Sequence, residues 1–254
     1  MDVERYTLRG RPRRVVRAIL LAVVRRALHL QIEHLERIPP AGPVIVYSNH
    51  LHNADPILMV MVFPRPIHYM AKKEVFHVPV IKWIVRMVGA FPVDRGKADR
   101  NAIRRAEAAL AAGVAVGMFP EGTRSETLAL RQAHAGTGLL ALRNDVPVLP
   151  VAITGTERLP FNGAKGRLQA QHQLPDPGHR GVRIVFGEPF RIPREILARR
   201  TTPEDATEIM MIKLAQMLPP DYRGVYADKV TSAPIGTGEP AQVPEQPASV
   251  QTFR

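Results

Sequence analysis

The alternation of short apolar runs with helical patterns constrains the fold of this chain more than any other feature. Runs rich in β-branched and aromatic residues are typical of strands and occupy residues 43–48, 67–71, 114–119, 148–153 and 182–186. Helical patterns lie between them or after them, at residues 56–63, 80–88, 100–112, 138–143 and 203–218. This order predicts a single α/β domain with a largely parallel or mixed sheet flanked by helices, whose ligands bind beyond the carboxyl ends of the strands.

Composition fits one large domain with small appendages. The chain has 254 residues, of which 45% are hydrophobic, so it can bury a substantial core. We expect a basic amphipathic helical arm over residues 1–34, the domain itself over residues 35–230, and a disordered tail rich in proline and small polar residues over residues 231–254. The absence of cysteine excludes a disulfide framework, a zinc–thiolate site and a catalytic thiol.

Charge indicates an anionic partner without identifying it. The formal net charge is +12, and residues 1–40 hold nine arginines against four acidic residues. Arginines interrupt the apolar run of the arm, so it is too short to span a bilayer, and it lacks the features of a secretory signal. The arm could lie in the headgroup region of an anionic membrane, or it could pack on the core with its arginines in solvent.

The first polar loop is the stretch VIVYSNHLHNADP, in which an apolar run ends at Asn49-His50 and Asp55 follows. One interpretation makes Asp55 the N-cap of a helix that begins at Pro56. The other lets Asp55 bind one nitrogen of His50, so that the second nitrogen can accept a proton from an alcohol. We do not expect a metal at His52, because the spacing of neighbouring ligand types matches no zinc signature.

Two further polar loops follow predicted strand ends. The stretch GAFPVDRG carries Asp94 and Arg95, and the stretch FPEGTRS contains Glu121, Gly122, Thr123 and Arg124. A guanidinium offers donors that suit a phosphate, and exposed backbone amides near glycine can assist it. Each loop alone is equally typical of an ordinary turn with a solvated ion pair.

Taken together and in this order, the loops resemble the glycerolipid acyltransferase family. NHLHNAD resembles the NHxxxxD block of that family, GAFPVDR its second block, FPEGTRS its third, and VPVLPVAI at residues 146–153 its fourth. The similarity extends from about Leu35 to Tyr226. Pro92 departs from the family pattern, in which that position is usually aromatic or aliphatic, so the shape of the second loop is in question.

The resemblance implies an O-acyltransferase that moves a fatty acyl group from a thioester to a hydroxyl of a lysophospholipid, with 1-acylglycerol 3-phosphate giving phosphatidic acid. It makes His50 the general base and Asp55 the residue that orients it. It assigns the acceptor phosphate site to Arg95, Arg124, Glu121, Gly122 and Thr123, and the support of the pocket to Asn49, Asp94, Val148 and Pro150.

The resemblance also implies the partners. Acyl-CoA or acyl carrier protein would be a co-substrate, and no cofactor or metal is expected. We expect peripheral or monotopic attachment to an anionic membrane at the cytoplasmic face, through the arm or the helix around Trp83. Alternatives are an acyltransferase for glycerol 3-phosphate or a lyso-aminolipid, and a non-catalytic membrane-binding or lipid-carrying protein. A nucleic-acid partner is not expected, because aromatic residues make up only 6% of the chain and form no stacking row.

Overall fold

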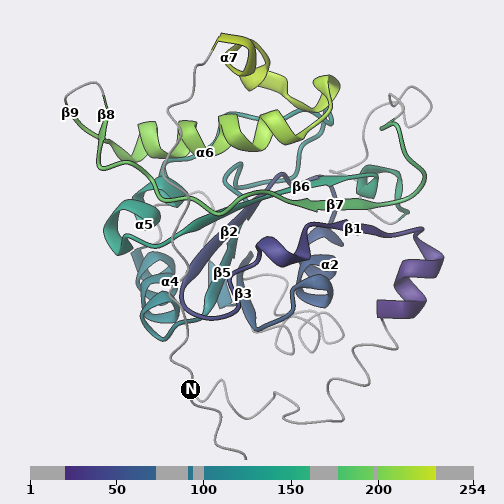
Figure 1. The fold of residues 1–254 in the computed structure, drawn as a ribbon, viewed down its shortest axis with the longest axis horizontal. Coiled ribbons are helices and arrows are strands. Elements are labelled where there is room, and N and C mark those ends of the chain that lie inside the picture. The colour runs from purple at the N-terminus through teal and green to yellow at the C-terminus, as the bar shows by residue number, and fades with distance from the viewer. Residues whose placement is uncertain (1–20, 73–90, 94–99, 161–176, 197–198, 233–254) are drawn as a thin grey trace, which may run out of the picture.

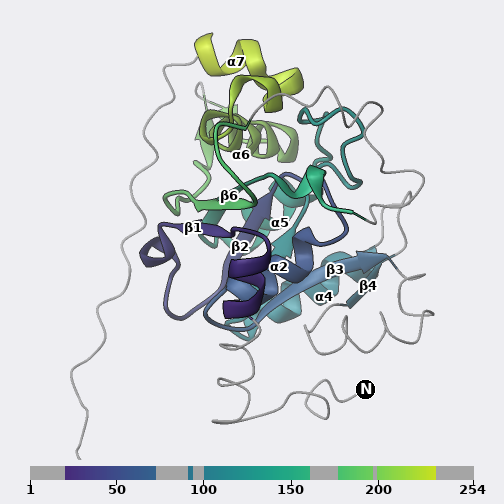
Figure 2. The same cartoon turned by 90° about the vertical axis from the view of Figure 1, so that its right-hand side faces the viewer.

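A seven-stranded sheet forms the centre of the computed structural model, which describes residues 21–72, 91–93, 100–160, 177–196 and 199–232. The strand order is β1-β7-β6-β2-β5-β3-β4, with β4 visible beside β3 in Figure 2 and the other strands labelled in Figure 1. The strands are β1 (Gln31–Glu33), β2 (Val44–Ser48), β3 (Ile67–Lys72), β4 (Phe91–Val93), β5 (Ala115–Met118), β6 (Val148–Thr154) and β7 (Arg183–Phe186). The predicted single α/β domain with a mostly parallel, mixed sheet is confirmed.

The direction of the strands brings several loops to one edge. β6, β2, β5, β3 and β4 are neighbours in that order and run parallel, whereas β7 is antiparallel to β6 and parallel to β1. The carboxyl ends of the five parallel neighbours therefore lie along the same edge of the sheet. The loops after β2, β4 and β5, which contain the three polar motifs, start from that edge.

Helices cover both faces of the sheet (Figures 1 and 2). The buried core on one face joins the sheet to α4 (Arg100–Ala111), α5 (Gly136–Asn144) and α6 (Pro203–Met217), and the core on the other face joins it to α2 (Asp55–Val62). Short elements complete the described chain: η2 (Leu35–Arg37), η4 (Thr156–Arg158), η7 (Pro220–Tyr222), η8 (Gly224–Tyr226), α7 (Ala227–Ser232), and the antiparallel pair β8 (Glu195–Ile196) and β9 (Arg199–Arg200).

Burial on both faces explains why β2 is a continuous apolar run. Ile45 and Tyr47 belong to the core beneath α4, α5 and α6, and Val44 and Val46 belong to the core beneath α2. A strand covered on both sides shows no polar alternation, as is typical of parallel sheets. The Tyr47 hydroxyl also donates a hydrogen bond to the Met210 carbonyl at 2.9 Å, which ties β2 to α6.

The two expected helix starts had different outcomes. Thr202 caps α6 as predicted, since its side chain accepts from the Asp205 N–H while the Asp205 carboxylate accepts from the Thr202 N–H. The interpretation of Asp55 as an N-cap is wrong. Ala54 is the N-cap of α2, Asp55 is its first residue, and no side chain caps this helix because the Asp55 carboxylate points back to the preceding loop.

The ends of the described chain differ from the sequence expectation. Gln31–Glu33, placed in the arm, form the edge strand β1, where Ile32 pairs with Ile184. At the other end α7 continues through Ser232, two residues into the expected tail. The rest of that tail, residues 1–20 of the arm and the helix predicted at residues 80–88 lie outside the described residues. Within the described ranges, none of the helices combines the length and hydropathy that a bilayer span requires.

Candidate active site

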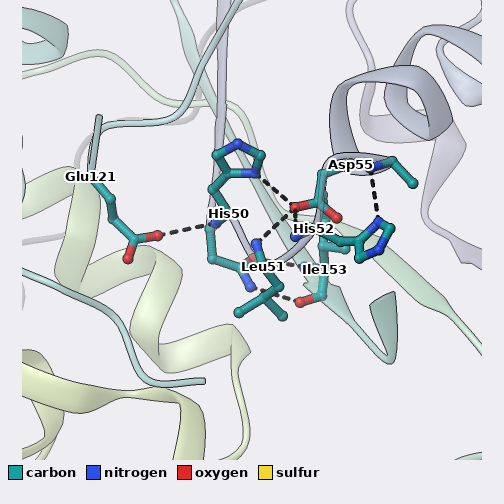
Figure 3. A network of polar contacts seen from close by, with 8 residues as sticks. His50, Leu51, His52, Asp55, Glu121 and Ile153 are labelled. Atoms are coloured by element: carbon teal, nitrogen blue, oxygen red, sulfur yellow. Dashed lines mark hydrogen bonds and ion pairs between the residues drawn. The ribbon is translucent and has the colours of Figure 1, made fainter. Parts of the chain in front are cut away.

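His50 and Asp55 form a buried pair directly after β2. The His50 Nδ1 atom lies 2.8 Å from Asp55 Oδ2, and the two residues are only 5% and 0% exposed (Figure 3). The same oxygen accepts hydrogen bonds from the backbone N–H groups of Leu51 and His52, each at 2.7 Å. A carboxylate acceptor at Nδ1 favours the tautomer whose proton is on Nδ1, which leaves the lone pair on Nε2. Figure 3 shows this second nitrogen turned away from Asp55.

The loop after β5 binds both backbone groups of His50. The His50 N–H donates to Glu121 Oε1 at 3.0 Å, and the Ser125 N–H donates to the His50 carbonyl at 2.7 Å. The second carboxylate oxygen of Glu121 accepts from the Arg131 N–H at 3.0 Å. The first and third motifs, about 70 residues apart in the chain, are thus joined at the residue that carries the imidazole.

Asn49 extends the pairing of β2 with β6 beyond the end of β2. Its side-chain amide donates to the Ile153 carbonyl at 2.7 Å, and its side-chain oxygen accepts from the Ile153 N–H at 2.9 Å. With these two buried hydrogen bonds, the Asn49 side chain binds the backbone N–H and carbonyl of Ile153 as the backbone of a neighbouring strand would. They fix the direction in which the chain leaves the sheet, so Asn49 acts on the position of the next residue, His50.

His52 has the contacts of a neutral structural histidine. Its Nδ1 accepts from the Ala54 N–H at 3.0 Å, so Nε2 carries the proton and donates to the Pro160 carbonyl at 3.2 Å. Burial lowers the pKa of His52, which agrees with this neutral form. Among the described residues, no group of three or more histidine, aspartate or glutamate side chains could hold a metal ion.

Glu121 connects the loops after β2 and β5 through its carboxyl oxygens. Burial raises its pKa to about 7, although the hydrogen bonds from the Arg131 and His50 N–H groups act in the opposite direction. Both of its oxygens accept from backbone groups, and a carboxylate would repel a phosphate. The described contacts therefore assign Glu121 to the shape of the site and leave any phosphate contact to other groups of the loop.

Some of the other predicted site residues lie on the loop after β5, and others lie inside the sheet. Gly122 adopts φ +69 in the turn after β5, Thr123 is exposed, and Arg124 is close enough to His52 to affect its titration. Val148 and Pro150 are buried inside the sheet, paired in register with Ile45 and Tyr47, so they build β6 and do not reach the edge. Asp94 and Arg95 lie outside the described residues.

Sequence reasoning missed two groups of residues that support the site. The ring of Phe119 stacks on the His50 imidazole with the centroids 4.0 Å apart, and Tyr69 lies on Phe119 at 5.4 Å. An aromatic residue at a strand end was the only available signal. In addition, the Tyr222 carbonyl accepts from the Leu130 N–H, and the Tyr226 hydroxyl accepts from the Ala133 N–H. Nothing in the sequence indicated these long-range contacts.

Glu121 makes the stability of the fold depend on pH. Its pKa rises from the ordinary value of 4.5 to about 7, so between these values the folded chain keeps a proton that the unfolded chain releases. As the pH rises from 4.5 to about 7, the free energy of unfolding should therefore fall by roughly 3 kcal/mol through Glu121 alone. Glu121→Gln should lack this pH-dependent loss. Urea unfolding at several pH values measures the difference between the two proteins.

Glu126, an exposed carboxylate on the same loop, provides the matched control. Glu126→Gln should parallel the wild type at every pH. A difference between wild type and Glu121→Gln that stays constant from about pH 4.5 to about pH 7 would contradict the raised pKa.

Known proteins that resemble this chain are acyltransferases. The family model described as Acyltransferase matches residues 29–154. The 1-acyl-sn-glycerol-3-phosphate acyltransferase of Bacillus subtilis is 33% identical over 50% of this chain and 63% of its own length. The chloroplastic enzyme of that name from Arabidopsis thaliana is 28% identical over 63% of this chain and 43% of its own length. The chain thus spans less than half the length of the Arabidopsis relative.

A solved structure shares the fold. The crystal structure of the 1-acyl-sn-glycerophosphate acyltransferase PlsC from Thermotoga maritima superposes with a TM-score of 0.56, covering 82% of this chain and 84% of that one at 24% identity. The segment that matches the family model contains the His50–Asp55 pair and the loop of Glu121, and the chain belongs to the glycerolipid acyltransferase family.

Proposed function

We propose that this chain is an O-acyltransferase that moves a fatty acyl group from an acyl thioester to the hydroxyl of 1-acylglycerol 3-phosphate, giving phosphatidic acid. The observation that carries the proposal is the buried hydrogen bond of 2.8 Å between His50 Nδ1 and Asp55 Oδ2 at the carboxyl edge of the sheet. The names of the relatives in Bacillus subtilis and Arabidopsis thaliana support this acceptor. The donor is acyl-CoA or acyl carrier protein.

The reaction needs one base and no covalent intermediate on the enzyme. The acceptor hydroxyl gives its proton to His50 Nε2 while its oxygen attacks the thioester carbonyl carbon. The carbon–sulfur bond then breaks, and the imidazolium returns the proton to the thiolate that leaves. Asp55 stabilises the imidazolium and keeps the ring oriented, as the acid does in a catalytic triad. Because the substrate supplies the oxygen, the chain itself needs no nucleophile.

We assign the acceptor phosphate to the cationic groups on the same edge. Arg124 belongs to the loop that binds His50, and its charge acts on His52. A guanidinium can donate two parallel hydrogen bonds to a phosphate. The Gly122 turn places Thr123 in solvent beside it. Arg95 completes the site in this proposal, since its loop follows β4 at the same edge.

We further propose peripheral attachment to the cytoplasmic face of an anionic membrane. In the described part of the arm, Leu21 and Val24 pack against the core, whereas Val23 is 60% exposed and Arg25 and Arg26 are exposed. An apolar side chain beside two arginines suits the headgroup region of an anionic bilayer. The lysophospholipid acceptor resides in that region, so attachment there would bring the site to its substrate.

Replacing the base tests the chemistry. His50→Ala should lower acyl transfer by about 100- to 10,000-fold, the usual contribution of a general base. Asp55→Asn should also lose rate, because an amide that presents its N–H to Nδ1 favours the wrong tautomer. Release of free coenzyme A from an acyl-CoA measures turnover, and thermal unfolding checks the fold.

His52→Gln is the matched control, since this neighbouring histidine is equally buried but makes only structural contacts through its ring. It should keep turnover within about tenfold of wild type, below the usual contribution of a base. A folded His50→Ala protein with near-normal turnover would rule out the mechanism.

Arg124→Ala tests phosphate recognition. Loss of a charged hydrogen-bond donor should raise the KM for 1-acylglycerol 3-phosphate by about 10- to 100-fold. Turnover of 1-acylglycerol, which lacks the phosphate, should change little. Initial rates with both acceptors at saturating acyl-CoA give the comparison, and Arg104→Ala on the exposed surface of α4 serves as the control. A rise in the acyl-CoA KM with the acceptor KM unchanged would reassign Arg124 to the donor.

Sedimentation with vesicles tests the membrane proposal. The full chain should bind vesicles that contain phosphatidylglycerol and should bind neutral phosphatidylcholine vesicles less, with binding weakened by salt. Deletion of residues 1–20 should release much of the protein, while leaving β1 and the helical residues before it intact. Equal binding by the folded truncation would move the anchor to another part of the chain, for which the segment around Trp83 is the candidate.

A further inference from the structure

The aromatic stack beside the proposed base has no role in the mechanism described so far. We infer that Phe119 is a positioning residue, whose ring, backed by Tyr69, holds the plane of the His50 imidazole and favours its protonated form. The inference rests on the proposed function, because it concerns the residue that would accept the proton. It adds a contact with the face of the ring to the hydrogen bonds that position His50.

The Phe119 ring restricts the plane of the His50 imidazole in addition to the hydrogen bond from Asp55. The bond from Nδ1 to Asp55 fixes one edge of the ring, and the backbone bonds to Glu121 and Ser125 fix the main chain. The plane of the imidazole changes by rotation about its Cβ–Cγ bond, which would also lengthen the contact between Nδ1 and Asp55. The ring of Phe119 lies against the imidazole face at a centroid distance of 4.0 Å and an interplanar angle of 18°. This face contact opposes the rotation and keeps Nε2 directed at the acceptor.

The sheet holds Phe119 in place through Tyr69. The two rings are stacked with centroids 5.4 Å apart, and Tyr69 is 1% exposed. Tyr69 pairs in register with Gly117 of β5, and Phe119 directly follows the end of that strand. The Tyr69 ring lies directly over that glycine, as shown by the clash that a Cβ atom at Gly117 would make with Tyr69 Cζ. Strand register therefore sets the order His50, Phe119, Tyr69.

The stack also has an electrostatic consequence. The face of an aromatic ring carries partial negative charge and attracts a cation placed over it. The imidazolium formed during acyl transfer would lie on such a face, so Phe119 makes proton acceptance by His50 more favourable. Among the described residues, the titratable groups around His50 are Asp55 of α2, His52 of the same loop, Glu121 and Arg124 of the loop after β5, and Tyr69 of β3.

Phe119→Leu removes the ring while keeping an apolar side chain. We expect kcat to fall by about 10- to 100-fold with small changes in both KM values, because orientation and not binding is lost. The acidic limb of the pH–rate profile should move by about half a pH unit toward lower pH, since the imidazolium loses a cation–π contact. Phe119→Tyr retains the ring and should restore both properties.

NMR titration gives a readout that does not depend on activity. The ring resonances of His50, assigned by their loss in His50→Ala, should titrate about half a pH unit lower in Phe119→Leu than in wild type. Phe190→Leu is the matched control. Phe190 is 4% exposed and packs in the core on the other face of the sheet, so its loss should lower thermal stability and leave the His50 titration unchanged.

The outcomes separate this inference from the proposed function. A wild-type kcat and a wild-type His50 titration in Phe119→Leu would overturn the inference. A Phe119→Tyr protein as defective as Phe119→Leu would also overturn it. So would a loss of kcat in Phe119→Leu that has no shift of the His50 titration and that Phe190→Leu shows equally. If Phe119→Leu does not fold, Phe119→Met replaces it, since Met fills space without a ring. An active His50→Ala protein would instead refute the proposed function, whatever the Phe119 variants do.

Discussion

The site depends on the three hydrogen bonds that the Asp55 carboxylate accepts. A single oxygen, Oδ2, accepts from the His50 ring and from the backbone N–H groups of Leu51 and His52, with all four residues buried. These three bonds fold the loop after β2 back onto the first turn of α2. Removal of the carboxylate would leave three buried donors without their acceptor, so the same side chain closes the loop and orients the ring.

In the described part of the site, hydrogen bonds to backbone groups connect the loops after β2 and β5. Glu121 supplies two acceptor oxygens for two N–H groups that belong to different loops, a task that an amide side chain cannot perform. Burial of this carboxylate opposes its ionisation and raises its pKa to about 7. The fold thus tolerates a group that is costly to ionise, because that group connects the loop of the imidazole with the loop of Arg124.

Sequence alone predicted the parts of the structure that depend on local pattern. The apolar run of β2 was sufficient to predict the strand end. The residues left the His50–Asp55 pair as one of two interpretations, and the resemblance to the family selected the one that the structure shows. β1 was missed because it has only three residues, of which Ile32 packs against the core, and so short a run shows no alternation of apolar and polar residues. The Phe119 stack was missed because it depends on the register between β3 and β5, which a single sequence does not encode locally.

Contacts around the edge of the sheet form a closed circuit. Asn49 joins the end of β2 to β6, and in η4, three residues beyond the end of β6, the buried Glu157 accepts from the Tyr222 hydroxyl at 2.8 Å. The Tyr222 carbonyl accepts from Leu130, on the loop whose Glu121 returns to His50. A displacement of any one loop would strain bonds in the other two. The C-terminal turn at Tyr222, far from the motifs in sequence, is therefore part of what keeps the base in position.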